Sequence, residues 1–365
     1  MKRRRFLRSA AAATAGAALS ACARQQTTST ATGAAQTEFR WKMVTTWPPN
    51  LPGLGTGASD LAQYIEAASN GRIRIKVYGA GELVPAFEVF DNVANGTAEL
   101  GHGASYYWKG KAEAATFFSA IPFGFTANEM NAWLLFGGGM ELWRELYEPF
   151  GVWPLVAGNT GVQSGGWFKR EINTPDDLKG LKMRIPGLGG EVLARAGGTP
   201  VTLPGTEIFT ALQTGAIDAA EWVGPYNDLA LGFHKAARYY YQPGWQEPGP
   251  ALECIVNRKA WDALPADLQK IVELACGSVN TRMLAEYDAR SFEALEQMTD
   301  VHKVDVREFP AEVLAHLKRI TATVLEEKAA ADAAFARVYE SYRGFADGIN
   351  KWTRIGLKAY LATRS

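Results

Sequence analysis

Residues 39–78, FRWKMVTTWPPNLPGLGTGASDLAQYIEAASNGRIRIKVY, contain the pattern that decides the fold. The first nine are mostly apolar and strand-forming, and they end at a pair of prolines. Apolar residues then recur at helical spacing over 61–68, and the Asn-Gly pair at 70–71 is a typical helix stop. Residues 72–78 alternate between polar and apolar side chains, as a half-buried strand does. The stretch therefore predicts a β-α-β unit.

The same alternation of short strands and helices continues through the first two thirds of the chain. We expect strands over 98–104, 152–158, 165–168, 181–185 and 217–222, helices over 85–95, 189–196 and 206–214, and a capped helical turn at 173–180. From 261 to 361 long helical patterns dominate, for example over 264–274 and 311–338. This order predicts an α/β fold, and the roughly 330 residues after the N-terminal segment suffice for two domains that share a cleft.

The first 22 residues have the features of an export signal. A basic start, MKRRRFLR, precedes an apolar run that is shorter than the roughly 20 residues needed to span a bilayer. The paired arginines match a twin-arginine signal, and the LSAC sequence at 19–22 resembles a lipoprotein cleavage site that would lead to acylation of Cys22. The alternative is a plain secretory signal cleaved nearby, with Cys22 removed or incidental. We therefore expect a periplasmic protein, with residues 23–37 as a flexible tether.

Charge and cysteine content narrow the range of partners. The 365-residue chain has 38 basic and 38 acidic residues, but five of the basic ones lie in the export signal, so 33 face 38 in the remainder. No basic patch or tail is evident in the sequence, which argues against nucleic acid as a partner. After Cys22 only Cys254 and Cys276 remain. We expect two buried free thiols, although an oxidising compartment would allow them to pair.

Motifs of common catalytic and cofactor sites are missing from the sequence. The segment GLGTGA at 53–58 has the glycine spacing of a dinucleotide loop, but prolines separate it from the preceding strand. We therefore expect only a flexible loop that enters a helix. Three glycines at 137–139 predict a break between helices. The four histidines lack metal-binding spacing and no nucleophile-elbow motif occurs, so we expect a protein that is not an enzyme.

Polar residues at the ends of strand-like segments are the candidate binding residues. Gln163 follows a glycine-flanked segment, and Arg184 lies in an alternating strand, where its planar fork can bind a carboxylate unless the strand simply exposes it to solvent. Glu221 and Trp222 end another strand, and Glu247 lies in a proline-rich loop. Two carboxylates and an amide near an arginine are costly to bury unless a cation and an anion fill the site. Oxygen ligands of this kind suit Na⁺ or Ca²⁺ and not zinc.

Three motifs in the middle of the chain carry a family resemblance. They are DLKGLKMR at 177–184, GGTP at 197–200 and ALQTGAID at 211–218. They resemble the extracytoplasmic solute-binding subunits of TRAP transporters, the tripartite ATP-independent periplasmic systems, and the similarity runs from about residue 41 to at least 261. The resemblance implies an α/β, two-lobed periplasmic-binding-protein fold of class II-like type, with an interlobe cleft and a helical C-terminal region. The implied boundaries are 38–160 plus about 246–300 for lobe I, 161–245 for lobe II and 301–365 for the helical region.

A narrower match is to the members of this family that bind 2-oxo acids. Similar motifs are GELVP at 81–85, GNTGVQ at 158–163, EWVGPY at 221–226, and YYY and PGW within 239–245. The resemblance implies that Arg184 holds the carboxylate of the ligand. It also implies that one cation, Na⁺ or Ca²⁺, bridges ligand and protein through the side chains of Gln163, Glu221 and Glu247 and the carbonyl of Trp222. The stretch His102-Gly103-Ala104 corresponds to a loop that touches the ligand from the other lobe, and its small residues leave the pocket size open.

The implied ligand is a small 2-oxo or 2-hydroxy monocarboxylate, similar to pyruvate or lactate, which the closed protein would deliver to the membrane permease subunits. A dicarboxylate, a sugar acid or a carboxamide is the alternative ligand, and a second basic residue in the cleft would favour a dicarboxylate. An exported lipoprotein enzyme is the remaining alternative. Some relatives exchange a long C-terminal helix between protomers, and the shorter tail here leaves a homodimer undecided.

Overall fold

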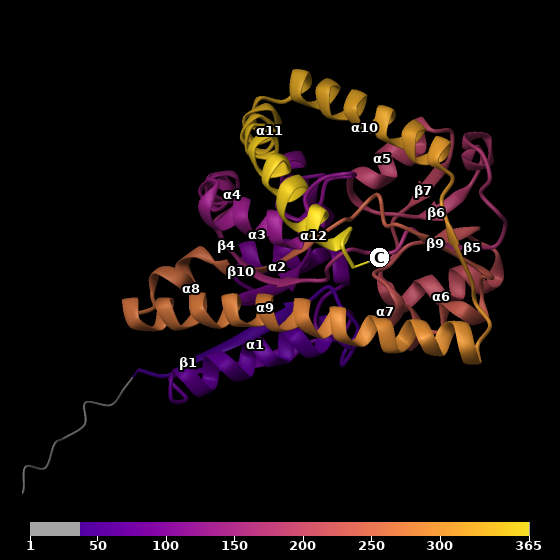
Figure 1. The fold of residues 1–365 in the computed structure, drawn as a ribbon. Helices are drawn as coiled ribbons and strands as arrows, with labels where there is room; N and C mark the ends of the chain where they lie inside the picture. Colours follow the sequence, from indigo (N-terminus) through magenta and orange to yellow (C-terminus); the bar gives the residue numbers. More distant parts are fainter. Residues whose placement is uncertain (1–36, 365) are drawn as a thin grey trace, which may run out of the picture. The chain divides into compact units, whose positions relative to one another are not determined.

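Two β-sheets form the framework of the computed structural model, which describes residues 37–364 (Figure 1). The first sheet has five strands in the order β2-β1-β3-β10-β4. β1 pairs in parallel with β2 and β3, whereas β10 runs antiparallel to β3 and β4. Its strands are β1 (Phe39–Thr45), β2 (Ile73–Tyr78), β3 (Leu100–Gly103), β4 (Val152–Asn159) and β10 (Ala251–Asn257).

The second sheet has six short strands in the order β11-β9-β5-β8-β6-β7. β6 is parallel to β7 and β8, β9 is parallel to β11, and β5 runs antiparallel to its neighbours β8 and β9. Its strands are β5 (Gly166–Phe168), β6 (Lys182–Arg184), β7 (Thr199–Val201), β8 (Ala219–Ala220), β9 (Tyr239–Gln242) and β11 (Asp305–Glu308). The α/β class predicted from the alternating pattern is thus confirmed.

Helices cover both sheets (Figure 1). The longest, α9, packs against β4 and α1 and also against α7, so it runs from the first sheet to the elements of the second. The α-helices are α1 (Leu54–Ala68), α2 (Val89–Ala94), α3 (Ala127–Phe136), α4 (Gly139–Tyr147), α5 (Gly187–Arg195), α6 (Gly205–Thr214), α7 (Pro225–Ala230), α8 (Arg258–Asp262), α9 (Ala266–Glu296), α10 (Ala311–Ala331), α11 (Ala333–Thr353) and α12 (Ala359–Leu361). The shorter turns are η1 (Ala86–Glu88), η2 (Ser105–Trp108), η3 (Glu113–Phe118), η4 (Glu148–Phe150), η5 (Pro175–Leu178), η6 (Phe233–Lys235), η7 (Gln297–Val301) and η8 (Arg354–Lys358).

The C-terminal region differs from its sequence prediction in two places. The helix expected over 311–338 is broken at Asp332, whose carboxylate accepts a hydrogen bond from the backbone N–H of Phe335 at 2.8 Å and caps α11. α10 then packs on α5 and α11 on α4, so the break redirects the chain from one sheet's helices to the other's. The region predicted as helical also contains a strand, β11, which joins the edge of the second sheet beside β9. β11 has only four residues, and its first and last are charged, so its sequence shows too little polar and apolar alternation to predict a strand.

The glycine-rich segment at 53–58 is not the flexible loop predicted from its sequence. It forms the N-cap and first turn of α1, which begins at Leu54. A Cβ added at Gly53 would lie 2.6 Å from the ring of Tyr287, and one at Gly57 would lie 2.3 Å from the side chain of Met283. The glycines therefore allow α1 to pack closely on α9, which is a tertiary reason for their presence. The predicted break at 137–139 is confirmed, since α3 ends at Phe136 and α4 begins at Gly139.

The chain passes between the two sheets three times, after β4, after β9 and after β10, within the compact unit Glu38–Ser365. The first two passages are the ones that concern lobe II. These passages lie near the predicted ends of lobe II, at 161 and 245, but α9 extends past both sheets and the lobe boundaries stay a prediction. The predicted strand over 217–222 is shorter in the structure, with ladder pairing only at Ala219–Ala220. The residues that follow it leave the sheet, which becomes important at the candidate site.

Several expectations concern residues outside those that the structure describes. The export signal at 1–22, lipidation of Cys22 and the tether up to residue 36 all lie there and stay predictions. In residues 37–364, no helix combines the length and apolarity needed to cross a membrane. The expected pair of buried free thiols is confirmed, with Cys254 on β10 and Cys276 on α9.

A buried carboxylate lies in the centre of the first sheet. Glu253 of β10 is fully buried and accepts hydrogen bonds from the indole N–H of Trp108 and from the hydroxyl of Tyr147, the latter at 3.0 Å. Both partners are neutral, so desolvation dominates and raises the pKa of Glu253 to about 8. The folded protein thus holds a proton at neutral pH that the unfolded chain releases.

Glu253→Gln should change the pH dependence of stability. Because the folded pKa lies above the unfolded one, this carboxyl makes folding less favourable as pH rises between the two, by at most about 1.4 kcal/mol per pH unit. Glutamine keeps the shape and cannot ionise. We expect the free energy of unfolding of the variant, minus that of the parent, to increase from about pH 5 to about pH 8 in urea titrations. A difference that does not vary with pH would contradict this.

Candidate functional site

The polar residues selected from the sequence converge at one edge of the second sheet. Arg184 is the last residue of β6, and Glu221 follows β8 directly. Because β6 and β8 are parallel, with Arg184 paired to Ala220, their carboxyl ends meet at the same edge. Gln163 precedes β5 and Glu247 follows β9, and these two strands are antiparallel, so their adjoining ends reach that edge as well.

Arg184 is buried and is held in place by both sheets. Its Nη1 donates to the backbone carbonyl of Glu221 at 2.9 Å and to the Glu221 carboxylate, and its Nε donates to the carbonyl of Leu203 at 3.2 Å. Nη2 makes one long contact, 3.3 Å to the hydroxyl of Tyr107, which comes from the first sheet's side. The guanidinium also lies 4.9 Å from the ring of Trp222. Nη2 is therefore the part of the fork with capacity for a further acceptor.

Several buried oxygens next to Arg184 have no hydrogen-bond partner in the part of the chain that the structure describes. They are Oε1 of Gln163, Oε2 of Glu221, Oε1 of Gln246 and Oε2 of Glu247. Leaving one such acceptor unpaired costs on the order of 1–3 kcal/mol, and more for a charged group. Hard cations such as Na⁺ and Ca²⁺ take this all-oxygen kind of ligand set. The residues present thus fit a cation, and Gln246 is a member of the cluster that sequence reasoning missed.

The two carboxylates are electrostatically strained. Desolvation raises the pKa of Glu221 to about 7, although Arg184 acts in the opposite direction. Desolvation raises the pKa of Glu247 well above its usual range, and the nearby charge of Glu221 raises it further. No group of three or more acidic, His or Cys side chains is gathered for a metal within residues 37–364. A cation here would rely on these two carboxylates, completed by the Gln163 amide and the Trp222 carbonyl.

The predicted stretch His102-Gly103-Ala104 lies at the end of β3 and is buried. The Nδ1 of His102 accepts a hydrogen bond from the indole N–H of Trp47 at 2.8 Å, and its Nε2 donates to the carbonyl of Ala157 at 3.1 Å. Burial lowers the pKa of His102 to about 4, so the ring is neutral. Both ring nitrogens are thus hydrogen-bonded, and the histidine fixes the position of the Trp47 indole. Its direct contact with a ligand stays a prediction, as do those of Gly103 and Ala104.

A small pocket between the two sheets lies next to these residues. Its volume is about 10 Å³, and it is lined by Trp47, Leu54, Tyr106, Tyr107, Thr160, Gln163, Trp222, Val223 and Leu252. Residues from both sheets' connections contribute to it, so it lies where the interlobe cleft is predicted. The ring centroids of Trp47 and Trp222 lie 6.3 Å apart across it.

Sequence reasoning missed the aromatic wall of this pocket. Tyr106 and Tyr107 stand out only as part of an aromatic run, and Trp47 only as the end of a strand-like segment. The one available signal is position, since the tyrosines follow β3 and Trp47 follows β1 within a few residues, at the carboxyl ends of parallel strands. The first sheet therefore provides mainly aromatic surface, whereas the second provides the charges.

Further contacts hold the two sides of the cleft together. The ammonium of Lys109 donates to the carbonyl of Gly187 at 3.0 Å. The amide nitrogen of Asn227 donates to the carbonyl of Pro52 at 2.7 Å, and its amide oxygen accepts from the hydroxyl of Tyr287 at 2.8 Å. α7, which carries Asn227, is thereby tied both to the loop before α1 and to α9. Contacts of this kind keep solvent away from the site and strengthen its electrostatics.

Comparison with known proteins agrees with this architecture. The chain matches the family model described as bacterial extracellular solute-binding protein, family 7 (DctP), over residues 43–332. It is 46% identical, over 99% of this chain and 98% of the relative, to the monocarboxylate 2-oxoacid-binding periplasmic protein of Nostoc sp..

Two solved structures resemble the fold across most of its length. A TRAP transporter solute-binding protein of Bordetella bronchiseptica, a mixed-occupancy dimer with copurified calcium and picolinate, matches with a TM-score of 0.88 at 39% identity, covering 90% of this chain and 97% of that one. A TRAP periplasmic solute-binding protein of Pseudoalteromonas atlantica, with bound sodium and pyruvate, matches with a TM-score of 0.87 at 43% identity, covering 89% and 99%. With the family match across most of the chain, these similarities identify the protein as a member of the bacterial extracellular solute-binding protein family 7, the DctP family.

Proposed function

We propose that this solute-binding protein captures a small 2-oxo or 2-hydroxy monocarboxylate by means of Arg184 and a bridging Na⁺ or Ca²⁺. The observation that carries the proposal is the juxtaposition of a buried arginine, whose Nη2 has spare capacity, with unpartnered oxygens of Gln163, Glu221 and Glu247. The names of the similar proteins, which refer to 2-oxoacids, pyruvate, sodium and calcium, support it. The protein acts by binding and not by catalysis.

The chemistry of recognition follows from the side chains. Arg184 presents Nη2 to the carboxylate of the ligand, and Gln163, Glu221, Glu247 and the Trp222 carbonyl would hold the cation. The cation, when bound, supplies a charge that a carboxylate oxygen and the neighbouring 2-oxygen can chelate together. Acids without that second oxygen would leave it under-coordinated and would bind weakly.

The pocket lining favours a monocarboxylate over the alternative ligands. No lysine or arginine is among the residues that line it, and the guanidinium of Arg184 contacts two of them, Tyr107 and Trp222. A dicarboxylate or a sugar acid with two charges would lack a second counter-charge. The aromatic lining also disfavours a sugar acid, whose hydroxyls need many polar partners.

We propose that the closed protein delivers its ligand to TRAP membrane permease subunits. The family description as extracellular fits the export signal predicted at residues 1–22. Anchoring through Cys22 would keep the protein near such a permease. The two lobes, with the predicted boundaries at about 161 and 245, would open and close about their connecting segments.

Arg184→Ala should weaken pyruvate binding by at least about a hundredfold. The substitution removes the guanidinium that would bind the ligand carboxylate, and it leaves the Glu221 carboxylate buried without its arginine partner. Arg184→Lys, which keeps the charge but loses the planar fork, should still weaken it by about tenfold or more. Isothermal titration measures both, with Arg319→Ala on the exposed face of α10 as the matched control. Unchanged affinity in Arg184→Ala, with normal circular dichroism, would refute the role of Arg184.

Cation and ligand binding should release protons near neutral pH. The pKa values of Glu221 and Glu247 are raised, so the pair keeps a proton that a cation must displace. We expect tight pyruvate binding only with added Na⁺ or Ca²⁺, an affinity that falls as pH drops below about 7, and heats that differ between buffers of different ionisation enthalpy. Chelator-treated protein titrated at several pH values tests this.

Glu221→Gln should weaken both the cation-dependent binding of pyruvate and the buffer-dependent heat, because one of the two carboxylates that share the proton and hold the cation is lost. Glu326→Gln, which removes one exposed carboxylate from α10, is the matched control and should retain both. Cation-independent binding by the parent protein would argue against a bridging metal, while leaving the carboxylate role of Arg184 to be judged separately.

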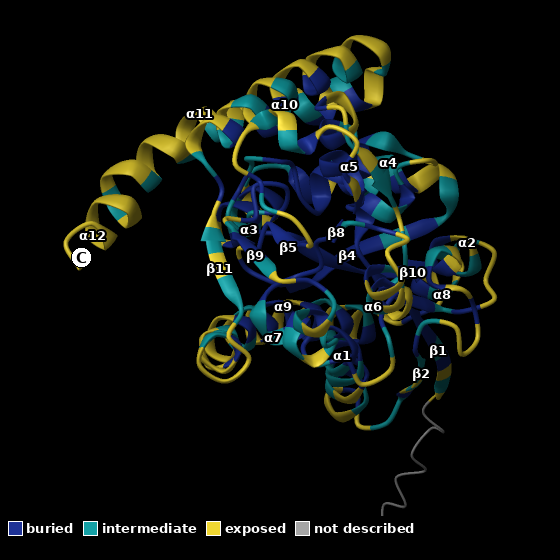
Figure 2. Ribbon diagram, turned by 90° about the vertical axis from the view of Figure 1, so that its right-hand side faces the viewer, coloured by how far each residue is buried: buried dark blue, intermediate teal, exposed yellow. Residues whose placement is uncertain are grey.

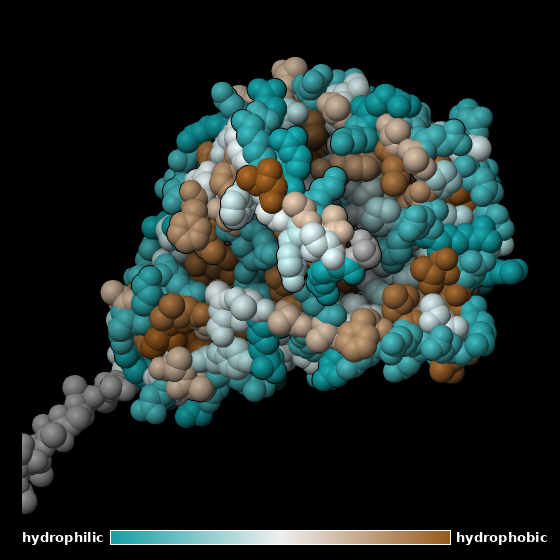
Figure 3. All heavy atoms as spheres, in the orientation of Figure 1, coloured by the Kyte–Doolittle hydropathy of each residue, from teal (hydrophilic) through white to brown (hydrophobic). Residues whose placement is uncertain are grey.

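We propose that the exposed C-terminal tail mediates a homodimer. Trp352, Ile355, Leu357, Tyr360 and Leu361 are exposed by 46–69%, on a part of the chain that extends away from the helices before it (Figure 2). The face shown in Figure 3 is otherwise largely hydrophilic, with apolar groups in separate patches. Contiguous exposed apolar side chains of this kind mark interaction surfaces. The mixed-occupancy dimer of the Bordetella bronchiseptica protein supports the proposal.

Trp352→Glu combined with Tyr360→Glu should convert such a dimer to monomers, because two charges would have to be buried in an apolar contact. Light scattering coupled to gel filtration gives the mass. Parent protein that elutes with the mass of one chain at all concentrations would rule the dimer out.

A further inference from the structure

A second pocket with a different chemistry lies at the opposite end of the second sheet. It has a volume of about 390 Å³ and is lined by six basic side chains, together with Ala236, Ala237 and Val304. We call it the basic pocket and define it by Lys169, His234, Lys235, Arg238, His302 and Lys303. No acidic residue is among its lining residues. It is therefore much larger than the cleft and carries the opposite sign of charge.

The topology of the sheet explains why these residues meet. Phe168 at the end of β5 and Asp305 at the start of β11 both pair with Tyr239, the first residue of β9. The residues adjacent to these paired positions are Lys169, Arg238 and Val304. Because the three strands pair there, these residues lie at the same edge of the sheet. The cleft residues Gln163 and Glu247 lie beyond the other ends of β5 and β9. At about 3.3 Å per residue, strands of three and four residues separate the two sites by roughly 10–13 Å of sheet.

The cations of the basic pocket are not neutralised by the protein. None of Lys169, Lys235 and Lys303 forms an ion pair within residues 37–364. Asp305 and Glu171 are both bound by Arg307, at 2.9 and 2.8 Å. Asp218, whose backbone carbonyl accepts from the N–H of Lys169, accepts the backbone N–H of Lys182 on its carboxylate. Arg238 acts weakly on Asp305, whose pKa is lowered chiefly by Arg307. Positive charges gathered in a concave surface focus a field that attracts anions.

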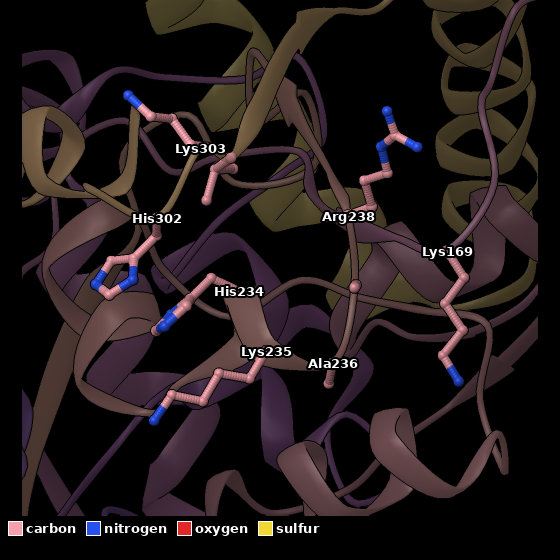
Figure 4. Close-up of a pocket in the computed structure, with 9 residues that line it drawn as sticks. Lys169, His234, Lys235, Ala236, Arg238, His302 and Lys303 are labelled. Carbon is pink, nitrogen blue, oxygen red and sulfur yellow. The ribbon is translucent and has the colours of Figure 1, made fainter. Parts of the chain in front are cut away.

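The two histidines add ring nitrogens to the pocket, and those of His234 lack partners. The rings of His234 and His302 lie side by side with centroids 4.2 Å apart, and Figure 4 shows them between Lys303 and Lys235, with Arg238 and Lys169 on the other side of Ala236. Both ring nitrogens of His234 are buried and have no hydrogen-bond partner in the described part of the chain. Burial and the neighbouring His302 and Lys235 lower the pKa of His234. An anion in the pocket would raise the pKa of His234 and would accept a hydrogen bond from the imidazole N–H.

We propose that the basic pocket is a second binding site, which takes a phosphate group. Figure 4 shows the charged ends of the four cations pointing to different sides of the pocket, so a phosphate would be held by the two imidazoles and the neighbouring Lys235, while the other cations attract it from a greater distance. A transition metal would also use histidines, but the four cations around these two repel it. The source of the phosphate is either a soluble phosphate compound or the headgroup of an anionic lipid, and both present the same chemistry to these side chains.

Titration of the purified protein with inorganic phosphate tests the proposal. Isothermal titration is run at constant ionic strength against sodium chloride, so that general screening cancels. We expect saturable phosphate binding that Lys235→Gln combined with Lys303→Gln weakens by at least about tenfold. The control combines Lys318→Gln with Lys358→Gln, which removes the same charge from exposed positions on α10 and η8, and it should bind phosphate like the parent. Pyruvate affinity should be equal in all three proteins, because neither lysine pair touches the cleft.

Vesicles distinguish the two sources. Co-sedimentation with phosphatidylglycerol vesicles but not phosphatidylcholine vesicles, reduced in Lys235→Gln/Lys303→Gln alone, would identify a lipid headgroup. Phosphate binding without vesicle binding would identify a soluble phosphate compound. Heats that match sodium chloride, or a phosphate affinity that is the same in the basic-pocket variant and the parent, would overturn the proposal.

Discussion

The buried contact between Arg184 and Glu221 is the interaction on which the binding site depends. A guanidinium that is 1% exposed is tolerable only with a carboxylate beside it, and Glu221 provides one through both its side chain and its backbone carbonyl. Glu247 adds a second negative charge that the arginine cannot neutralise at the same time. The protein alone therefore leaves the site with more acceptors than donors. A cation and an anionic ligand together would correct this imbalance, which is why a receptor can afford such a costly interior.

The two sheets divide the work of recognition between them. The second sheet brings Arg184, Glu221, Gln163 and Glu247 to one edge because the ends of four strands coincide there. The first sheet supplies Trp47, Tyr106 and Tyr107, whose rings cover that edge and exclude solvent. In the proposed mode of binding, charge from one lobe and apolar cover from the other would make affinity depend on closure, since each half alone would leave the ligand partly solvated. Hydrogen bonds such as Asn227 to Pro52 stabilise the closed arrangement away from the ligand.

The opposite end of the same strands has a complementary character. There the basic pocket gathers cations without carboxylates, whereas the cleft gathers carboxylates around a single cation. β5 and β9 extend from one site to the other. One sheet thus presents an acceptor-rich site and a donor-rich site at its two ends. This difference between the two sites arises because the connections at one end of the sheet carry acidic and amide side chains, whereas those at the other end carry basic ones.

The sequence by itself determined the alternation of strands and helices, the strand-end position of Arg184 and Glu221, and the family to which the chain belongs. These are local properties, because periodicity, glycine stops and motif spacing need no knowledge of distant contacts. It could not reveal that GLGTGA is the tightly packed start of α1, that 311–338 breaks at Asp332, or that β11 completes the second sheet. Only the tertiary structure decided which polar atoms remain unpaired. His102 is satisfied by Trp47 and Ala157, whereas Gln163, Glu247 and His234 are not, and each of those outcomes depends on partners supplied by remote segments of the chain.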